Sequence, residues 1–423
     1  MGIVKNDKKI INGWAFFDWA NSAFTLVIST AVFPPYFAAN APDLVPVFGS
    51  NIDSNSVFSY SITFAYILIA LMTPMLSGIA DFSGRRKMFL RFFTLLGSLS
   101  CIALFFFEPS THLFTLLLFY VLGTIGFGGG IVFYNAYLPE ICTEDQYDAV
   151  SAKGYAYGYI GSVFLLLIIL LMITFNTSLG ISEILAVKLG FILVGIWWLV
   201  FSQITFKRLP DDKTTPFKMS FLKKGFDEVK IVGKQTLAEP NTVLFLSSYF
   251  FFIAGVNVVI LLASIFAKDE LGFESSQLIL LILLLQFLAA VGAYLFAYIS
   301  DKIGNKKSLM IQIMIWIGIC IAAYFTNSVM SFYIVSVFVG LVFGGIQSLS
   351  RSTYSKLITD DMIPLTSYFS FYDVLTKLAV VLGTFTFGFV NQLTGNMRYS
   401  VLALTVFFIL GAIFLHRVKI EKV

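Results

Sequence analysis

Polar residues share one face of an apolar segment near the N-terminus. They are Asp18, Asn21, Ser22 and Thr25. Their spacing of three, four and seven residues from Asp18 places them in one stripe along a helix. A carboxylate in apolar surroundings costs several kcal/mol unless it is paired, protonated or hydrated. The pattern therefore predicts that Asp18 binds a proton or a cationic group. The alternative is a carboxylate that only holds helices together by bonding neighbouring hydroxyls.

A second set of ionisable residues lies in the apolar segment 367–390, where Tyr372, Asp373 and Lys377 occur within two helical turns. Asp373 and Lys377 are four residues apart, so they can neutralise each other as a self-contained ion pair. The functional alternative is that one of them releases its partner in order to bind a solute or a proton.

Other residue types that could do chemistry give little support for catalysis. Gln347 and Arg351 lie at the end of an apolar segment, where an arginine either anchors the helix by snorkelling or contacts a ligand. His112 and His416 are the only histidines, and neither they nor the three cysteines have metal-ligand spacing. We predict no catalytic residue, no metal and no cofactor.

Composition restricts the class of protein strongly. Hydrophobic residues make up 58% of the chain and charged residues only 12%, whereas soluble proteins have roughly 25% charged residues. The net charge of +4 is too small and too dispersed for a nucleic-acid interface. The chain is therefore predicted to be an all-α polytopic membrane protein that binds no nucleic acid.

Apolar segments long enough to cross a bilayer need about 20 residues each. Twelve segments qualify, and we expect the spans at 13–38, 57–80, 88–107, 112–137, 154–175, 184–206, 241–266, 276–299, 308–326, 331–350, 367–390 and 399–416.

Lysine and arginine predict the orientation, because basic loops stay on the cytoplasmic side. If the N-terminus is cytoplasmic, that side receives 24 basic residues and the other side only 2. Both termini are therefore expected in the cytoplasm. The predicted domains are an N-terminal half (1–206), a linker (207–240) and a C-terminal half (241–423). In the linker, Phe217 to Lys230 has the spacing of an amphipathic helix on the membrane surface, although a solvated tether is an alternative.

Internal repetition supports two similar six-helix halves. The loop after the second span contains Asp81, Gly84, Arg85 and Arg86, and the loop after the eighth contains Asp301, Gly304 and Lys306. Two further matches, Cys-Ile-Ala and Phe-Gly-Gly, recur in the same order at a similar offset of about 220 residues. Such parallel repeats predict a binding site between the halves near the middle of the membrane.

The repeated loop has a mechanical rationale. Glycine permits a tight reversal, the basic residues hold the loop at an anionic surface, and the aspartate can accept hydrogen bonds from a neighbouring helix. The pattern resembles the loop signature of the major facilitator superfamily, although Phe82, Ser77 and Ala297 depart from it. We expect the loops, with Arg351, to take part in gating. A simple orientation signal is the alternative.

Longer motifs point to one branch of that superfamily. They are the runs 18–23, 135–140, 150–161, 344–352 and 372–377. Together they resemble the family related to the yeast vacuolar amino-acid effluxer of autophagy and its bacterial members. The resemblance implies a major facilitator fold, alternating access and export of amino acids or similar solutes. It also implies that spans one, four, seven and ten line the cavity.

The expected lining residues are Asp18, Asn21, Ser22, Asn257 and Gln347, with Tyr372, Asp373 and Lys377 as further candidates. Coupling to protons is expected because Asp18 and Asp373 can titrate and no nucleotide-binding motif is present. The expected setting is a monomer in the inner membrane of a bacterium, in contact with lipid, protons and a small solute. A multidrug exporter, a non-transporting sensor and a membrane-embedded enzyme are the alternatives.

Overall fold

The protein is almost entirely helical. A computed structural model describes residues 4–47, 49–212, 220–358 and 365–419, and within them twelve helices are long and apolar enough to cross a membrane. Each of the twelve predicted spans corresponds to one of these helices, so the predicted architecture is confirmed. Most of the helices run several residues beyond the predicted bounds, because polar residues at the water interface continue the helical turns.

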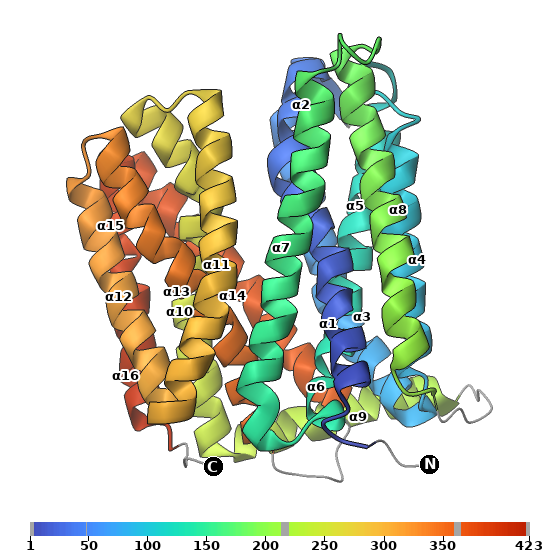
Figure 1. Ribbon diagram of the computed structural model, residues 1–423, viewed down its shortest axis with the longest axis vertical. Helices are drawn as coiled ribbons and strands as arrows, with labels where there is room; N and C mark the ends of the chain where they lie inside the picture. Colours follow the sequence, from blue (N-terminus) through green and yellow to red (C-terminus); the bar gives the residue numbers. More distant parts are fainter. Residues whose placement is uncertain (1–3, 48, 213–219, 359–364, 420–423) are drawn as a thin grey trace. The chain divides into compact units, whose positions relative to one another are not determined.

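The chain forms two compact units, and Figure 1 labels their helices. Unit 1 comprises Met1–Tyr137 and Tyr157–Val229, and unit 2 comprises Leu138–Ala156 and Lys230–Val423. The predicted domain limits at 206 and 240 stay a prediction. The short segment Leu138–Ala156, which contains the end of the fourth span and the beginning of the fifth, belongs to unit 2.

Unit 1 contains the first six spans and one small hairpin. Its elements are α1 (Lys8–Ala23), η1 (Phe24–Val32), α2 (Phe33–Asn40), β1 (Leu44–Val47), β2 (Ser50–Asp53), α3 (Ser54–Ser83), α4 (Arg86–Leu104), α5 (Pro109–Asn135), most of α7 (Tyr147–Thr174), and α8 (Glu183–Arg208). The antiparallel hairpin pairs Leu44 with Asp53.

Unit 2 contains the last six spans together with the start of α7. Its further elements are α6 (Leu138–Ile141), η2 (Glu144–Gln146), α10 (Pro240–Leu271), α11 (Ser275–Ile303), α12 (Asn305–Phe325), α13 (Val329–Leu357), α14 (Leu365–Thr394), α15 (Met397–Ala403) and α16 (Thr405–Arg417). The helix α9 (Ser220–Ala238) passes from unit 1 into unit 2.

The helix α9 lies where the linker was expected to be helical. Phe217 and Lys218, which belong to the predicted amphipathic pattern, lie outside the described residues. The second half of α9 packs on α14, since a Cβ atom at Gly233 would lie 3.2 Å from the Phe371 ring. The helical prediction is therefore confirmed for residues 220–230, the helix continues to Ala238, and its location on the membrane surface stays a prediction.

The first span changes its helical geometry halfway. Residues Phe24–Val32 form a π-helix between the α-helical stretches α1 and α2. The Thr30 hydroxyl donates to the Thr25 carbonyl five residues earlier at 2.9 Å, as this wider helix allows. The span expected at 13–38 therefore consists of three helical stretches. Long π-helices are rare and often occur at functional sites.

Both repeated loops contain a glycine with positive φ, although ψ is 26° at Gly84 and 154° at Gly304. Gly84 ends α3 with φ of +65°, and Gly304 stands between α11 and α12 with φ of +86°. Side chains other than glycine are strained at such angles. The tight turn between two helices that was predicted at each of these glycines therefore occurs in both halves of the chain.

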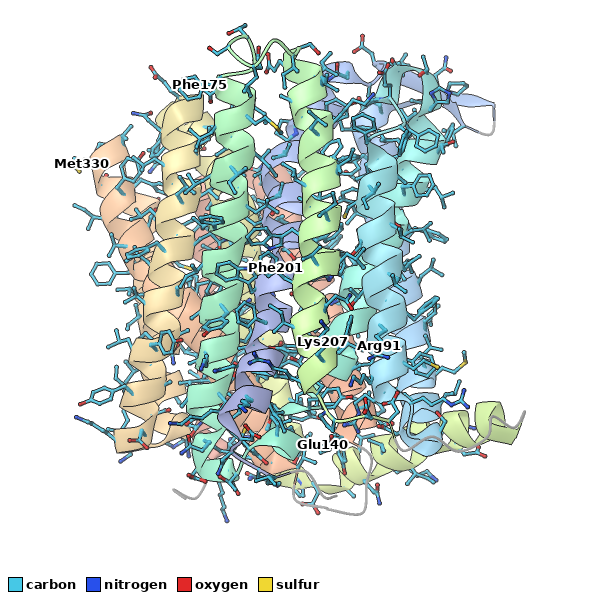
Figure 2. All side chains as sticks on the ribbon, turned by 45° about the vertical axis from the view of Figure 1, so that its right-hand side comes forward. Arg91, Glu140, Phe175, Phe201, Lys207 and Met330 are labelled. Carbon is cyan, nitrogen blue, oxygen red and sulfur yellow. The ribbon has the colours of Figure 1, made fainter. Side chains whose placement is uncertain are left out.

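A network of polar contacts joins the start of α4 to residues 209–212, directly after α8. We call this end of unit 1 its basic end. The Lys87 ammonium donates to the Leu209 carbonyl and to Asp211, both at 2.8 Å. Asp212 accepts from the first backbone N–H groups of α4, those of Lys87 and Met88. Lys87 holds the pKa of the Asp211 carboxyl below its ordinary value by hydrogen bonding and charge. Figure 2 shows Arg91 and Lys207 near this end and Phe175 at the opposite end of unit 1.

Candidate functional site

The Asp18 carboxylate is buried within unit 1 and has a hydroxyl partner. It is 5% exposed and accepts a hydrogen bond from the Tyr134 hydroxyl on α5 at 2.7 Å. Asp18 lies ten residues after the start of α1, which places it about 15 Å along the helix. A buried carboxylate in a membrane-spanning helix is the type of group that binds protons or cations in membrane proteins.

Aromatic packing positions the Tyr134 hydroxyl. Its ring stacks on Trp14 at 4.4 Å between centroids and on Phe17 at 4.9 Å. The Trp14 indole also donates to the Tyr134 carbonyl at 3.0 Å. Because three contacts fix the tyrosine, its hydroxyl is held at Asp18 with little rotational freedom.

The next residues of the polar stripe lie beside Asp18. Asn21 is fully buried, and neither its amide nitrogen nor its oxygen has a hydrogen-bond partner within the described residues. Ser22 faces α7, where a Cβ atom at Gly158 would lie 2.5 Å from its hydroxyl and 3.4 Å from Asp18 Cβ. Because Gly158 has no side chain, α7 can approach α1 closely at Asp18 and Ser22.

In unit 2, Asp373 and Lys377 form the ion pair that their spacing allows. The Lys377 ammonium lies 2.8 Å from Asp373 Oδ1, and both side chains are mostly buried. The other oxygen, Asp373 Oδ2, is buried without a hydrogen-bond partner in the described part of the chain. The pair is thus intact in this structure, and one carboxylate oxygen keeps its capacity to accept.

Tyrosines surround this ion pair. Tyr372 stacks on Tyr249 of α10 at 4.2 Å and on Tyr354 of α13 at 5.2 Å. The Tyr249 hydroxyl is 2.7 Å from Thr376 Oγ1, one residue before Lys377. The helices α10, α13 and α14 therefore contact one another through a cluster of tyrosine rings that carry hydroxyl groups.

The other two predicted lining residues lie in unit 2, on α10 and α13. Asn257 is partly buried, and its amide nitrogen donates to the Ile253 carbonyl one turn earlier at 3.0 Å. Gln347 is also partly buried. Each predicted lining residue therefore has a defined place in one unit, and its role stays a prediction.

The predicted gating loops make local contacts. Arg86 pairs with the buried Asp81 at 3.1 Å, and Arg85 occupies the position before α4. In unit 2, Lys306 donates to the His416 carbonyl at the end of α16 at 2.7 Å. Asp301 is exposed and has no ion-pair partner within the described residues. The two loops thus share a glycine with positive φ but differ in ψ at that glycine and in their side-chain contacts.

Arg351 is a buried part of unit 2 and does not snorkel. It is 2% exposed, and its guanidinium donates to the Ser151 hydroxyl at 2.9 Å and to the Ser151 carbonyl at 2.8 Å. The guanidinium also lies over the Tyr155 ring at 4.3 Å. Both partners are on the first three turns of α7, so Arg351 fastens that segment to α13.

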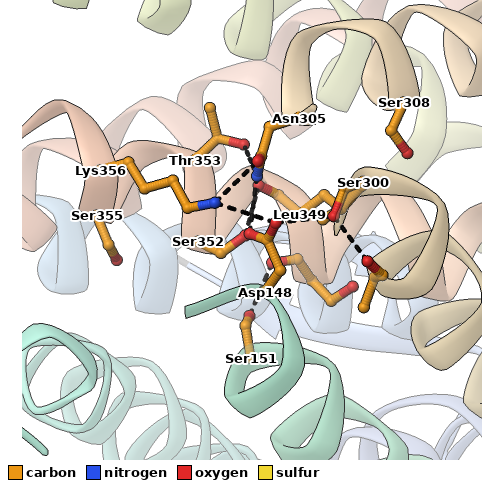
Figure 3. A network of polar contacts seen from close by, with 12 residues as sticks. Asp148, Ser151, Ser300, Asn305, Ser308, Leu349, Ser352, Thr353, Ser355 and Lys356 are labelled. Carbon is orange, nitrogen blue, oxygen red and sulfur yellow. Dashed lines mark hydrogen bonds and ion pairs between the residues drawn. The ribbon is translucent and has the colours of Figure 1, made fainter. Parts of the chain in front are cut away.

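A second network lies one turn earlier on α7, and Figure 3 shows it from close by. Asp148 accepts from Ser300 at 2.7 Å, from Asn305 at 2.8 Å and from Lys356 at 3.1 Å. These partners come from the end of α11, the start of α12 and the end of α13. The buried carboxylate is therefore paired and fully hydrogen-bonded.

Replacing Asp148 by Asn is expected to lower the free energy of unfolding by about 1–3 kcal/mol, because Lys356 would keep a largely buried charge without its counter-ion. Thermal unfolding in detergent measures the change. In the Asp148→Asn background, Lys356→Met removes the stranded ammonium and should recover part of the loss. A double variant less stable than Asp148→Asn would contradict the ion-pair account.

Sequence reasoning missed Tyr134, Asp148 and Ser151. Tyr134 directly precedes the motif 135–140, Asp148 lies two residues before the motif 150–161, and Ser151 is the second residue of that motif, so proximity to these motifs was a usable signal. Within the described residues no group of three or more His, Cys, Asp or Glu could hold a metal ion. The arrangement can bind a proton or an ammonium group at Asp18, with an amide beside it.

Comparisons with known proteins agree with these features. A family model described as "Vacuole effluxer Atg22 like" matches residues 6–423. YxiO of Bacillus subtilis, described as an uncharacterized transporter of the major facilitator type, is 31% identical over 415 residues, covering 98% of this chain and 95% of that protein. Autophagy-related protein 22 of Vanderwaltozyma polyspora is 24% identical over 492 residues, covering 99% of this chain and 92% of that protein.

Solved structures show the same fold. The fucose:proton symporter of Escherichia coli superposes with a TM-score of 0.69 at 14% sequence identity, covering 98% of each chain. At this identity the similarity concerns the fold alone.

Proposed function

Because the chain belongs to the Atg22-like vacuole effluxer family and has the major facilitator fold, we propose that it is a proton-coupled transporter that exports amino acids or related small metabolites. Family and fold confirm the prediction of a multi-pass membrane transporter rather than an enzyme. The substrate, direction and coupling are the proposed part. The proposed location is the cell membrane of a bacterium.

One observation supports the substrate class most directly. Asp18 and Asn21 are three residues apart on one helix, both are buried, and the Asn21 amide has no partner within the described residues. An unsatisfied buried polar group costs about 1–3 kcal/mol. An amino acid carries an ammonium that suits the carboxylate and a carboxylate that suits the amide donor. Protonation of Asp18 would release the ammonium, which couples solute movement to protons.

Transport by purified protein in liposomes tests the proposal. An amino-acid mixture inside the vesicles and a pH gradient across the membrane should give amino-acid efflux that a protonophore slows. Competition by a cationic dye instead of amino acids would support a multidrug exporter. A folded protein that moves no solute would contradict transport, and conversion of a solute would indicate an enzyme.

The orientation can be tested with single cysteines, since Cys101, Cys142 and Cys320 are all buried. Ser178, between α7 and α8, and Asp227 on α9 are both exposed. We expect Ser178→Cys to react with an impermeant thiol reagent in intact cells and Asp227→Cys to react only after lysis, since α9 lies in the basic linker. The reverse pattern would place both termini outside.

A further inference from the structure

Unit 2 has a cavity of about 620 Å³ at the end where α11 turns into α12. One wall is the segment that contains η2 and the first turn of α7, and the other is the turn around Gly304. The walls carry both acidic and basic side chains. The charged lining residues are Asp145, Asp148, Asp301, Lys306, Lys307 and Lys356.

The charges of this lining are balanced but only partly paired with each other. Asp148 and Lys356 form the ion pair described above. Lys306 reaches a backbone carbonyl, and Asp301 and Lys307 have no ion-pair partner within the described residues. Asp145 accepts from the amide of its neighbour Gln146 at 3.0 Å and, like Asp301, has no ion-pair partner in the described part of the chain. Two carboxylates, Asp145 and Asp301, and two ammonium groups, Lys306 and Lys307, thus keep hydrogen-bonding capacity for a ligand. A ligand with one anionic and one cationic group matches such a lining.

The cavity adjoins an exposed apolar helix face. Tyr294 and Tyr298 line it from α11 and are 47% and 59% exposed. The same face of α11 continues with the exposed side chains of Val291 and Phe287. Tyrosine is typical of the interface between headgroups and hydrocarbon, and the apolar face beyond it suits acyl chains. The polar cavity therefore has an apolar extension along a membrane-spanning helix.

We propose that this cavity binds the headgroup of a phospholipid that carries both a phosphate and a primary ammonium, as phosphatidylethanolamine does. The phosphate lies toward Lys306 and Lys307 on the first turn of α12, and the ammonium lies toward Asp145 and Asp301. The acyl chains follow the exposed face of α11. A headgroup with only a negative charge leaves the two carboxylates unmatched, and a quaternary ammonium cannot donate hydrogen bonds to them.

Native mass spectrometry of the purified full-length protein tests the proposal without measuring transport. The protein is mixed with dioleoyl phosphatidylethanolamine, phosphatidylglycerol or phosphatidylcholine at equal concentration. The ethanolamine lipid should be retained best. Lys307→Gln and Asp145→Asn should each weaken its retention about fivefold, the upper range for an exposed ion pair. Lys9→Gln, which removes an exposed ammonium from α1, should leave retention unchanged.

Competition with soluble compounds shows whether the ligand, which carries one anionic and one cationic group, is a lipid or a soluble solute. Soluble phosphoethanolamine and serine at millimolar concentration should not displace the lipid, because they lack the contacts of the acyl chains. Displacement by either would show a site for soluble solutes and overturn the lipid proposal. Equal retention of all three lipids would also overturn it, as would preference for phosphatidylglycerol or unchanged binding in both variants.

Discussion

Asp18→Asn is expected to lower the rate of proton-driven accumulation or efflux of the transported solute by at least about tenfold. Asparagine keeps the shape and can still accept from Tyr134, but it carries no charge and cannot titrate. If Asp18 couples protons, exchange of labelled for unlabelled solute should persist while gradient-driven transport is lost. If Asp18 binds the solute ammonium, both activities should be lost. Both rates are measured in proteoliposomes of equal protein content.

Two further variants distinguish chemistry from packing. Tyr134→Phe removes the hydroxyl that donates to Asp18 but keeps the ring that stacks on Trp14 and Phe17. It should reduce transport less than Asp18→Asn, because the carboxylate remains. Asp227→Asn removes an exposed carboxylate from α9 and should change neither rate. A folded Asp18→Asn protein with normal coupled transport would leave Asp18 only a packing role.

Gly344→Ala is expected to disrupt unit 2, because α11 and α13 approach each other backbone to backbone. A Cβ atom at Gly344 would lie 1.8 Å from the Ala289 carbonyl oxygen, and one at Gly292 would lie 1.9 Å from the Leu341 oxygen. No rotamer change relieves a clash with backbone, so the helices must separate along their length. Overpacking of this kind costs about 3 kcal/mol or more. The free energy of unfolding in detergent and the yield of monodisperse protein should both fall.

A matched glycine provides the control. Gly388 lies within the helix α14, and an added Cβ atom there would meet nothing within 4 Å. Gly388→Ala should be neutral or stabilising by up to about 1 kcal/mol, because alanine favours helix. If the free energy of unfolding of Gly344→Ala were as high as that of Gly388→Ala, the backbone-to-backbone contact of α11 and α13 would be contradicted.

The spans were predictable from sequence because hydrocarbon imposes one requirement on every crossing helix, a long apolar run. The π-helix at Phe24–Val32 was not, since its composition is the same as that of an α-helical span and only the hydrogen-bond register differs. Likewise the break at Leu404 between α15 and α16 leaves the last apolar run unchanged.

The polar residues were predictable in part. Asp18, Asp373 and Lys377 stand out because each interrupts an apolar run, and the pairing of Asp373 with Lys377 follows from their spacing within one helix. Asp148 stands at the polar start of its span, where a carboxylate is ordinary. Its partners follow 152 to 208 residues later, and no local pattern connects them. Tyr134 is one of 19 tyrosines, and apart from its place directly before the motif 135–140 only its contact with Asp18 distinguishes it.

The distance along the chain between Asp148 and Lys356 also determines when their ion pair can form during synthesis. A ribosome adds about 5–20 residues per second, so the 208 residues between them take roughly 10–40 seconds to make. During this time α11 and α12 are completed first and the end of α13 last, and all three belong to the same compact unit as the segment Leu138–Ala156. The start of the fifth span thus enters the membrane before its partners exist, and unit 2 becomes complete only when the last spans have been synthesised.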